Sequence, residues 1–177
     1  KVKSLTTLVL RNSKTTDADL KAVGELTNLR TLDLGQTGVS DAGLPALAGL
    51  TNLHSLTLDR TAVTGTGLKA LDKLGELTML TLNAAPVTDA GLATLPPLPK
   101  LSSLLLANTK VIGPGAKALA DCPGLTWVVL SGTPFADGGM VHLAGCPNLY
   151  SLDLSLTKVT DAGVKHLGGL ARLSNLA

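Results

Sequence analysis

The chain has 177 residues, of which 45% are hydrophobic but only 2% aromatic, and its formal net charge is +2. Its Lys and Arg residues are scattered and form no basic stripe, so nucleic-acid binding is not expected. No run of 18 or more apolar residues is present, so we expect no transmembrane helix and no membrane partner. A length of this order fits one domain.

One 24-residue pattern repeats along the whole chain. Its most regular copy, Leu29 to Asn52, has the form L-x-x-L-x-L-x-x-T-x-V-[ST]-D-A-G-L-x-x-L-x-x-L-x-x. The opening Leu, position one of each copy, recurs without insertion or deletion at Leu5, Leu29, Leu53, Leu77, Leu101, Leu125, Leu149 and Leu173. Such a period predicts that each copy forms one structural unit, which buries its apolar face against the next copy.

This pattern resembles the leucine-rich repeat, and the resemblance covers residues 1–177 as a single domain. It implies an α/β fold: a right-handed solenoid shaped like a horseshoe or arc. A parallel sheet should line the concave side and short helices the convex side. No copy buries enough apolar surface to fold alone, since ordering its backbone costs about 1–2 kcal/mol per residue, so stacking of neighbouring copies must supply the difference.

Two segments narrow the resemblance. LADCPGL (Leu119–Leu125) and LAGCPNL (Leu143–Leu149) are similar to the cysteine-containing repeats of F-box-type proteins. VIGPGAKALA (Val111–Ala120) resembles the GALA class of bacterial effectors, which implies a bacterial origin. Because no F-box is present and F-box-type repeats are longer, the resemblance implies a protein-binding scaffold and no ubiquitin-ligase role.

The first half of each copy has the alternation of a strand. In copy two, Leu32 and Leu34 should point into the core while Thr31 and Asp33 point to solvent. Thr37 then begins the turn, and a Thr or Ser stands at this position in most copies. Its hydroxyl can both donate and accept a hydrogen bond. We therefore expect a ladder of Thr hydroxyls between adjacent turns.

The second half has the signals of a short helix. Ser40 is a favourable N-cap, and Asp41 places a negative charge near the helix N-terminus. Leu44 and Leu47 follow at helical spacing, which predicts about two turns.

Later copies depart from the pattern at a few positions. Gly65 replaces the usual Asp in copy three. Pro96 and Pro97 should end the helix of copy four by about Leu95. Pro114 in copy five stands at a helix start, where proline is tolerated.

The two ends of the chain predict a fragment of a longer protein. It begins at Lys1 without Met or a signal-peptide pattern, and it ends at Ala177, four residues after Leu173 opens an eighth copy. Without such a signal the cytoplasm is favoured, and the compartment is otherwise open.

No arrangement of residues predicts catalysis, so we expect no enzymatic activity and no cofactor. His142 and His166 occupy equivalent positions in adjacent copies, as do Cys122 and Cys146. A metal site or an interlayer disulfide could be built from these residues. However, both cysteines stand where other copies have an inward Leu, which favours core packing and no metal.

The solvent side of the sheet carries the candidate binding residues. We call this side the concave face and assign it positions three, five, seven and eight of each copy. Copies four to six place apolar side chains there, including the only Trp of the chain, and copies two and three place charges. Tyr150 lies one residue before its strand. The candidate partner-binding residues are Met79, Leu105, Trp127, Val129, Tyr150, Asp33, Asp59 and Arg60.

An exposed apolar cluster with Trp and Tyr is typical of a protein interface. The sequence therefore predicts a non-enzymatic protein–protein interaction scaffold that binds an unidentified protein partner on its concave face. Two alternatives stay open. The apolar residues could cover one another within the sheet, and the chain could be a structural spacer or a self-associating array attached to another functional domain.

Overall fold

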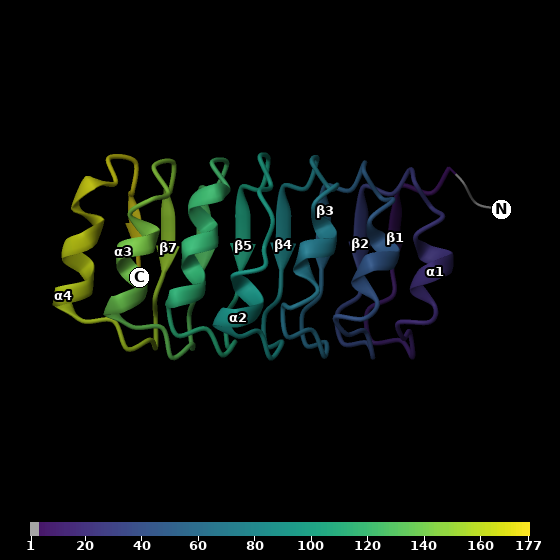
Figure 1. The fold of residues 1–177 in the computed structure, drawn as a ribbon, viewed down its shortest axis with the longest axis horizontal. Coiled ribbons are helices and arrows are strands. Elements are labelled where there is room, and N and C mark those ends of the chain that lie inside the picture. Colours follow the sequence, from purple (N-terminus) through teal and green to yellow (C-terminus); the bar gives the residue numbers. More distant parts are fainter. Residues whose placement is uncertain (1–3) are drawn as a thin grey trace.

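The computed structural model describes residues 4–177. Its residues form one parallel sheet of eight strands in the order β1-β2-β3-β4-β5-β6-β7-β8, with one strand from each copy. The strands are β1 (Thr7–Val9), β2 (Thr31–Asp33), β3 (Ser55–Thr57), β4 (Met79–Thr81), β5 (Ser103–Leu105), β6 (Trp127–Val129), β7 (Ser151–Asp153) and β8 (Asn175–Leu176). Figure 1 shows these strands side by side in one row, with the helices of the copies aligned along the row. The predicted α/β solenoid, with a parallel sheet and short helices, is confirmed.

The helices of copies one to four are shorter than the predicted two turns, whereas those of copies five to seven reach about that length, with the two adjoining helices of copy seven counted together. Those of copies one to four have four residues each, and several have 3-10 geometry, because each copy must also turn back toward the next strand within its 24 residues. The α-helices are α1 (Leu20–Val23), α2 (Asp89–Leu92), α3 (Asp137–Leu143) and α4 (Asp161–Val164). The 3-10 helices are η1 (Leu44–Leu47), η2 (Leu68–Leu71), η3 (Pro114–Asp121) and η4 (Lys165–Gly169). Helix α2 ends before Pro96, and η3 begins at Pro114, as the two proline signals predict.

The core is a continuous stack of equivalent leucines. Leu32 of β2 lies in register with Leu56 of β3, and Leu56 with Leu80 of β4. All three are fully buried, while Thr31 and Asp33 are half-buried on the other side of the sheet. The register, in which position four always meets position four, follows from the constant copy length.

The expected Thr ladder between adjacent turns is wrong for the turn position. The Thr37 hydroxyl donates to the Leu34 carbonyl of its own copy, at 2.6 Å, because that carbonyl lies directly above it at the end of the strand. A hydroxyl ladder between copies forms instead at position two. There the Thr78 hydroxyl donates to the carbonyl of His54, and the Ser102 hydroxyl donates to the carbonyl of Thr78.

The Asp that recurs at the start of the helical half of most copies accepts hydrogen bonds from the next copy. Asp41 of copy two accepts from the Thr64 hydroxyl and from the backbone N–H groups of Thr64, Gly65 and Gly67, at 2.7–3.1 Å. The same reach into the next copy recurs at Asp17, Asp89 and Asp137. A β-carbon on Gly67 would lie 2.6 Å from the Asp41 carbonyl oxygen, so glycine is needed for this close approach.

Two copies lack this Asp and use a backbone carbonyl instead. Gly65 and Gly113 stand at the Asp position with φ of +98° and +147°, a region that favours glycine. The carbonyl just before Gly65, that of Thr64, accepts from the N–H of Thr88 in the next copy. The carbonyl of Ile112 likewise accepts from the N–H of Ala136. At each of these junctions the N–H groups of the next copy thus donate either to an Asp carboxylate or to a backbone carbonyl.

Position eight is a left-handed residue in the turn after each strand. Its φ lies between +52° and +69° in every copy, at Asn12, Gln36, Arg60, Ala84, Asn108, Gly132 and Leu156. A residue other than glycine has a strained backbone in this region, at a cost of about 1 kcal/mol.

Replacement of Ala84 by glycine should therefore stabilise the protein, by roughly 0.5–1 kcal/mol, since the left-handed conformation is strained for alanine and free for glycine. Ala90, in the helical α2, is an exposed control where Ala→Gly should destabilise by about 0.5–1 kcal/mol. Urea unfolding monitored by circular dichroism would measure both changes. A loss of stability in Ala84→Gly would contradict the strain argument.

The carboxylate of Asp41 should make stability depend on acid pH. Burial of this carboxyl opposes ionisation, but the hydrogen bonds from Gly67, Thr64 and Gly65 outweigh burial and lower its pKa below 3.8. Its contribution should be complete at neutral pH, where the carboxyl is ionised in both states. It should fall as the pH drops below the unfolded-state value and vanish below the folded-state pKa.

The matching variant is Asp41→Asn, which loses acceptor capacity toward copy three and should cost about 1–3 kcal/mol at pH 7. Asp72→Asn, an exposed residue after η2, should change stability by less than about 0.5 kcal/mol. The difference between Asp41→Asn and the unmutated protein should shrink in unfolding experiments below about pH 3.8, the ordinary value for this carboxyl. An equal difference at pH 7 and at pH 2.5 would refute the role of ionised Asp41.

Candidate functional site

The concave face carries an apolar patch over β4 to β6. Trp127 lies in the same row as Ser103 and Met79, whereas Val129 pairs in register with Leu105. Trp127 is 41% exposed, and Met79, Leu105 and Val129 are half-buried. In the structure these four side chains lie on one solvent-facing surface, and the strand register brings Leu105 and Val129 side by side.

Trp127 also lines a hollow that extends toward β8. The other residues of this hollow are Ser151, Leu152, Asp153, Ser174, Asn175, Leu176 and Ala177. Tyr150, which is 53% exposed, faces a different hollow at the start of the strands, with Thr126, Asn148 and Arg172. The two aromatic residues thus lie in neighbouring copies but line separate depressions.

The two acidic candidates, Asp33 and Asp59, are held by an arginine that the sequence analysis did not select. The Arg11 guanidinium bonds to Asp33 at 2.8 Å, and its other nitrogen lies 3.8 Å from Asp59. Asp33 also accepts from the N–H of Gly35, and Asp59 accepts from the N–H of Asn83. Both acids are therefore fixed in position and partly neutralised. The signal that could have revealed the pairing is that Arg11, Gly35 and Asp59 share position seven in consecutive copies.

Arg60 does not join this network. It lies in the left-handed turn after β3 and is exposed. Its guanidinium takes part in no salt bridge within the described part of the chain. Asp33 and Asp59 are thus brought together, whereas Arg60 stands at the rim of the face.

The cysteine and histidine candidates do not form a site. Cys122 and Cys146 are buried free thiols, as the packing interpretation predicts. Burial raises the pKa of both, and the nearby Cys122 adds to the effect at Cys146, whose pKa rises to about 11. Across residues 4–177, no group of three or more His, Cys, Asp or Glu side chains could hold a metal ion.

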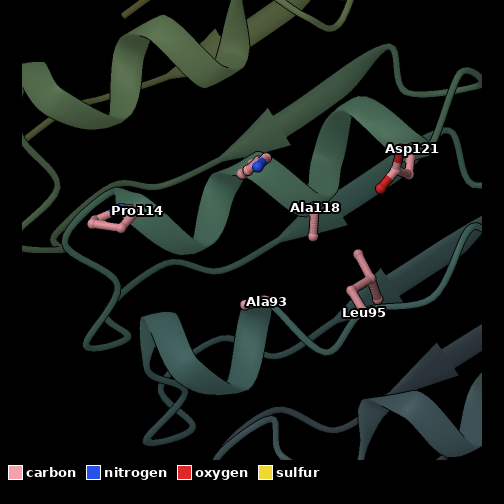
Figure 2. A pocket seen from close by; sticks show the side chains of 6 residues that line it. Ala93, Leu95, Pro114, Ala118 and Asp121 are labelled. Atoms are coloured by element: carbon pink, nitrogen blue, oxygen red, sulfur yellow. The ribbon is translucent and has the colours of Figure 1, made fainter.

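A hollow on the convex side lies between copies four and five (Figure 2). Figure 2 shows Ala93 and Leu95, which follow α2, facing Pro114, Ala118 and Asp121 of η3. Lys117 completes the lining. The hollow lies where the four-residue helix α2 faces the eight-residue η3. Its lining has small side chains and no aromatic anchor, so it is a weaker candidate than the concave face.

In the part of the chain that the structure describes, no helix is long and apolar enough to cross a membrane.

The buried thiols should be unreactive in the folded protein. A thiol reagent added at pH 8 should modify neither Cys122 nor Cys146 at an appreciable rate, because both are buried and their raised pKa values leave little thiolate. Unfolding in guanidinium should release both thiols. Rapid modification of the folded protein would contradict core packing, and fewer than two thiols after unfolding would show that a disulfide has formed.

Comparisons with known proteins agree with this geometry. A family model described as Leucine Rich repeat matches residues 25–48 and 145–168. A crystal structure of internalin C2 from Listeria monocytogenes is similar, with a TM-score of 0.67 and 24% identity, over 99% of this chain and 81% of that chain. The structure of the plant peptide hormone receptor RGFR1 in complex with RGF2 has a TM-score of 0.66 and 20% identity, over 99% of this chain and 32% of the receptor. A comparison with curated protein sequences gives no match.

The repeat period, the stacked parallel strands, the family model and the fold of these neighbours lead to one conclusion. The chain has the leucine-rich repeat fold, and its residues 25–48 and 145–168 match the leucine-rich repeat family.

Proposed function

We propose that the chain is a non-enzymatic scaffold that binds a protein partner on its concave face, with Trp127 as the main anchor. The observation that carries this proposal is the exposure of Trp127 at the edge of an apolar patch with Leu105 and Val129. Soluble proteins rarely leave such a cluster open without a use, and Trp is among the side chains that contribute most to protein interfaces.

The neighbouring residues support a partner of protein size. Met79 extends the patch along the row of Trp127, and Tyr150 offers a second exposed aromatic side chain in a separate hollow of the neighbouring copy. At the other end of the face, Asp33 and Asp59 are held by Arg11, and Arg60 stands at the rim. In the proposed complex the apolar patch supplies most of the affinity, and the charged end orients the partner.

The fold comparisons support the class of function. The plant receptor of similar fold is a peptide hormone receptor, and its structure contains RGF2. A chain with this architecture therefore does hold another molecule, and the apolar patch of the present chain gives a place for one.

The test is a cross-linking capture from a lysate of the source cell, which compares the unmutated chain with Trp127→Asp. Loss of a Trp anchor typically costs 2 kcal/mol or more, so the recovery of a true concave-face partner should fall by about 30-fold. Val141→Asp is the matched control, because Val141 is exposed on α3 of the convex side and should leave recovery unchanged.

Circular dichroism and the unfolding midpoint would establish that both variants fold. Equal recovery of the partner by folded Trp127→Asp would refute the concave site. If the captured protein were the chain itself, sedimentation of the purified protein at several concentrations would show self-association, the alternative to a foreign partner.

A further inference from the structure

Some acidic residues on the strands of the concave face are paired with a basic residue, and one is not. Positions three, five and seven carry four charged residues among residues 4–177, namely Arg11, Asp33, Asp59 and Asp153. Arg11 pairs with both Asp33 and Asp59. Asp153, at the opposite end of the face, takes part in no salt bridge within the described residues. Among residues 4–177, this carboxylate of the face is thus not paired with a cation.

Asp153 is nevertheless held firmly in one orientation. One of its carboxylate oxygens accepts from the N–H of Ser155 at 2.9 Å. Partial burial of this carboxyl opposes ionisation, but hydrogen bonds from the side chain and backbone of Ser155 and from the Ser131 hydroxyl outweigh it and lower the pKa. A half-exposed carboxylate is therefore ionised and preorganised on the concave face at neutral pH.

Asp153 and Trp127 line the same hollow. In the register of β6 and β7, Trp127 pairs with Ser151 and Val129 pairs with Asp153, so Trp127 and Asp153 are diagonal neighbours on one face. Strands about 4.8 Å apart, with a rise of about 3.3 Å per residue, place their Cα atoms about 8 Å apart. Ser151 and Asn175, which also line the hollow, add polar groups to its lining.

We propose that this hollow receives a Lys or Arg side chain of the protein partner, with its cation against the indole of Trp127 and paired with Asp153. The inference rests on the proposed concave-face function and names the chemistry that the partner must present. An aromatic face attracts a cation by its quadrupole, and the carboxylate supplies the opposite charge. An apolar side chain in the same place would bury the Asp153 carboxylate without a partner, which is costly.

The experiment is a selection from a random peptide library displayed on phage, with the immobilised chain as bait. The unmutated chain, Asp153→Asn and Trp127→Ala are used in parallel. Asp153→Asn removes the charge and keeps one oxygen that can accept from the N–H of Ser155, although its second oxygen is replaced by an amide nitrogen. Asp121→Asn, an exposed residue at the end of η3 on the convex side, is the control for the change in net charge.

The proposal expects the unmutated chain and Asp121→Asn to enrich peptides with a Lys or Arg that is lost from the selection on Asp153→Asn. Replacing that basic residue by norleucine in a synthetic peptide should weaken binding by about 10-fold for the unmutated chain and less than about 2-fold for Asp153→Asn. Binding can be followed by the fluorescence of the chain's only Trp.

Two other results would overturn the inference and are distinguishable from each other. Peptides that require Trp127 but carry no enriched basic residue, or whose basic residue is insensitive to Asp153→Asn, would refute the cation site and leave concave-face binding intact. Binders indifferent to Trp127→Ala, or no binders at all, would count against both this inference and the proposed function.

Discussion

Each copy of this chain completes its hydrogen bonding through the copy beside it. The Asp41 carboxylate closes the turn of copy three, and the Thr78 hydroxyl reaches back to the carbonyl of His54 in the copy before. These bonds are possible only if equivalent atoms of neighbouring copies stay at a constant separation. The invariant 24-residue length is therefore the constraint on which the sheet register, the buried leucine stack and the concave face all depend.

The same constraint explains why the concave face varies more than the core. Positions one, four and six meet the same positions of both neighbours in the core, so a change such as Val128 beside Leu104 must stay close in size, since a larger one leaves a cavity or an overlap. Positions three and five meet their neighbours only along the surface, so Ser103 can stand between Met79 and Trp127 without disturbing the strands. The residues of a binding surface can thus change on this face of the sheet without disturbing the core packing.

The sequence predicts the backbone of this structure better than it predicts its polar contacts. The strands, the inward leucines and the burial of Cys122 and Cys146 follow from the period alone, because apolar burial depends on position within a copy. The pairing of Arg11 with Asp33 and Asp59 depends on how far one long side chain reaches across two strands, which no pattern within a copy encodes.

The prediction of a hydroxyl ladder between the turns is wrong for a related reason. Thr37 has a carbonyl of its own copy and positions in the next copy as rival partners, and only the backbone geometry decides between them. The candidate site shares this limit. The place of Trp127 at position three predicts that it faces solvent. The separate hollow of Tyr150 could not be predicted, because it depends on the exact course of the chain before β7.

The junctions between copies are of two chemical kinds, and only one kind contains a titratable group. Backbone carbonyls join copy three to copy four and copy five to copy six, next to Gly65 and Gly113, and protons do not affect them. Carboxylates join copies two and three through Asp41, and copies six and seven through Asp137, and hydrogen bonds lower the pKa of both groups. Acidification therefore weakens the junctions that Asp41 and Asp137 hold, and it leaves the backbone hydrogen bonds of the two junctions next to Gly65 and Gly113 unchanged.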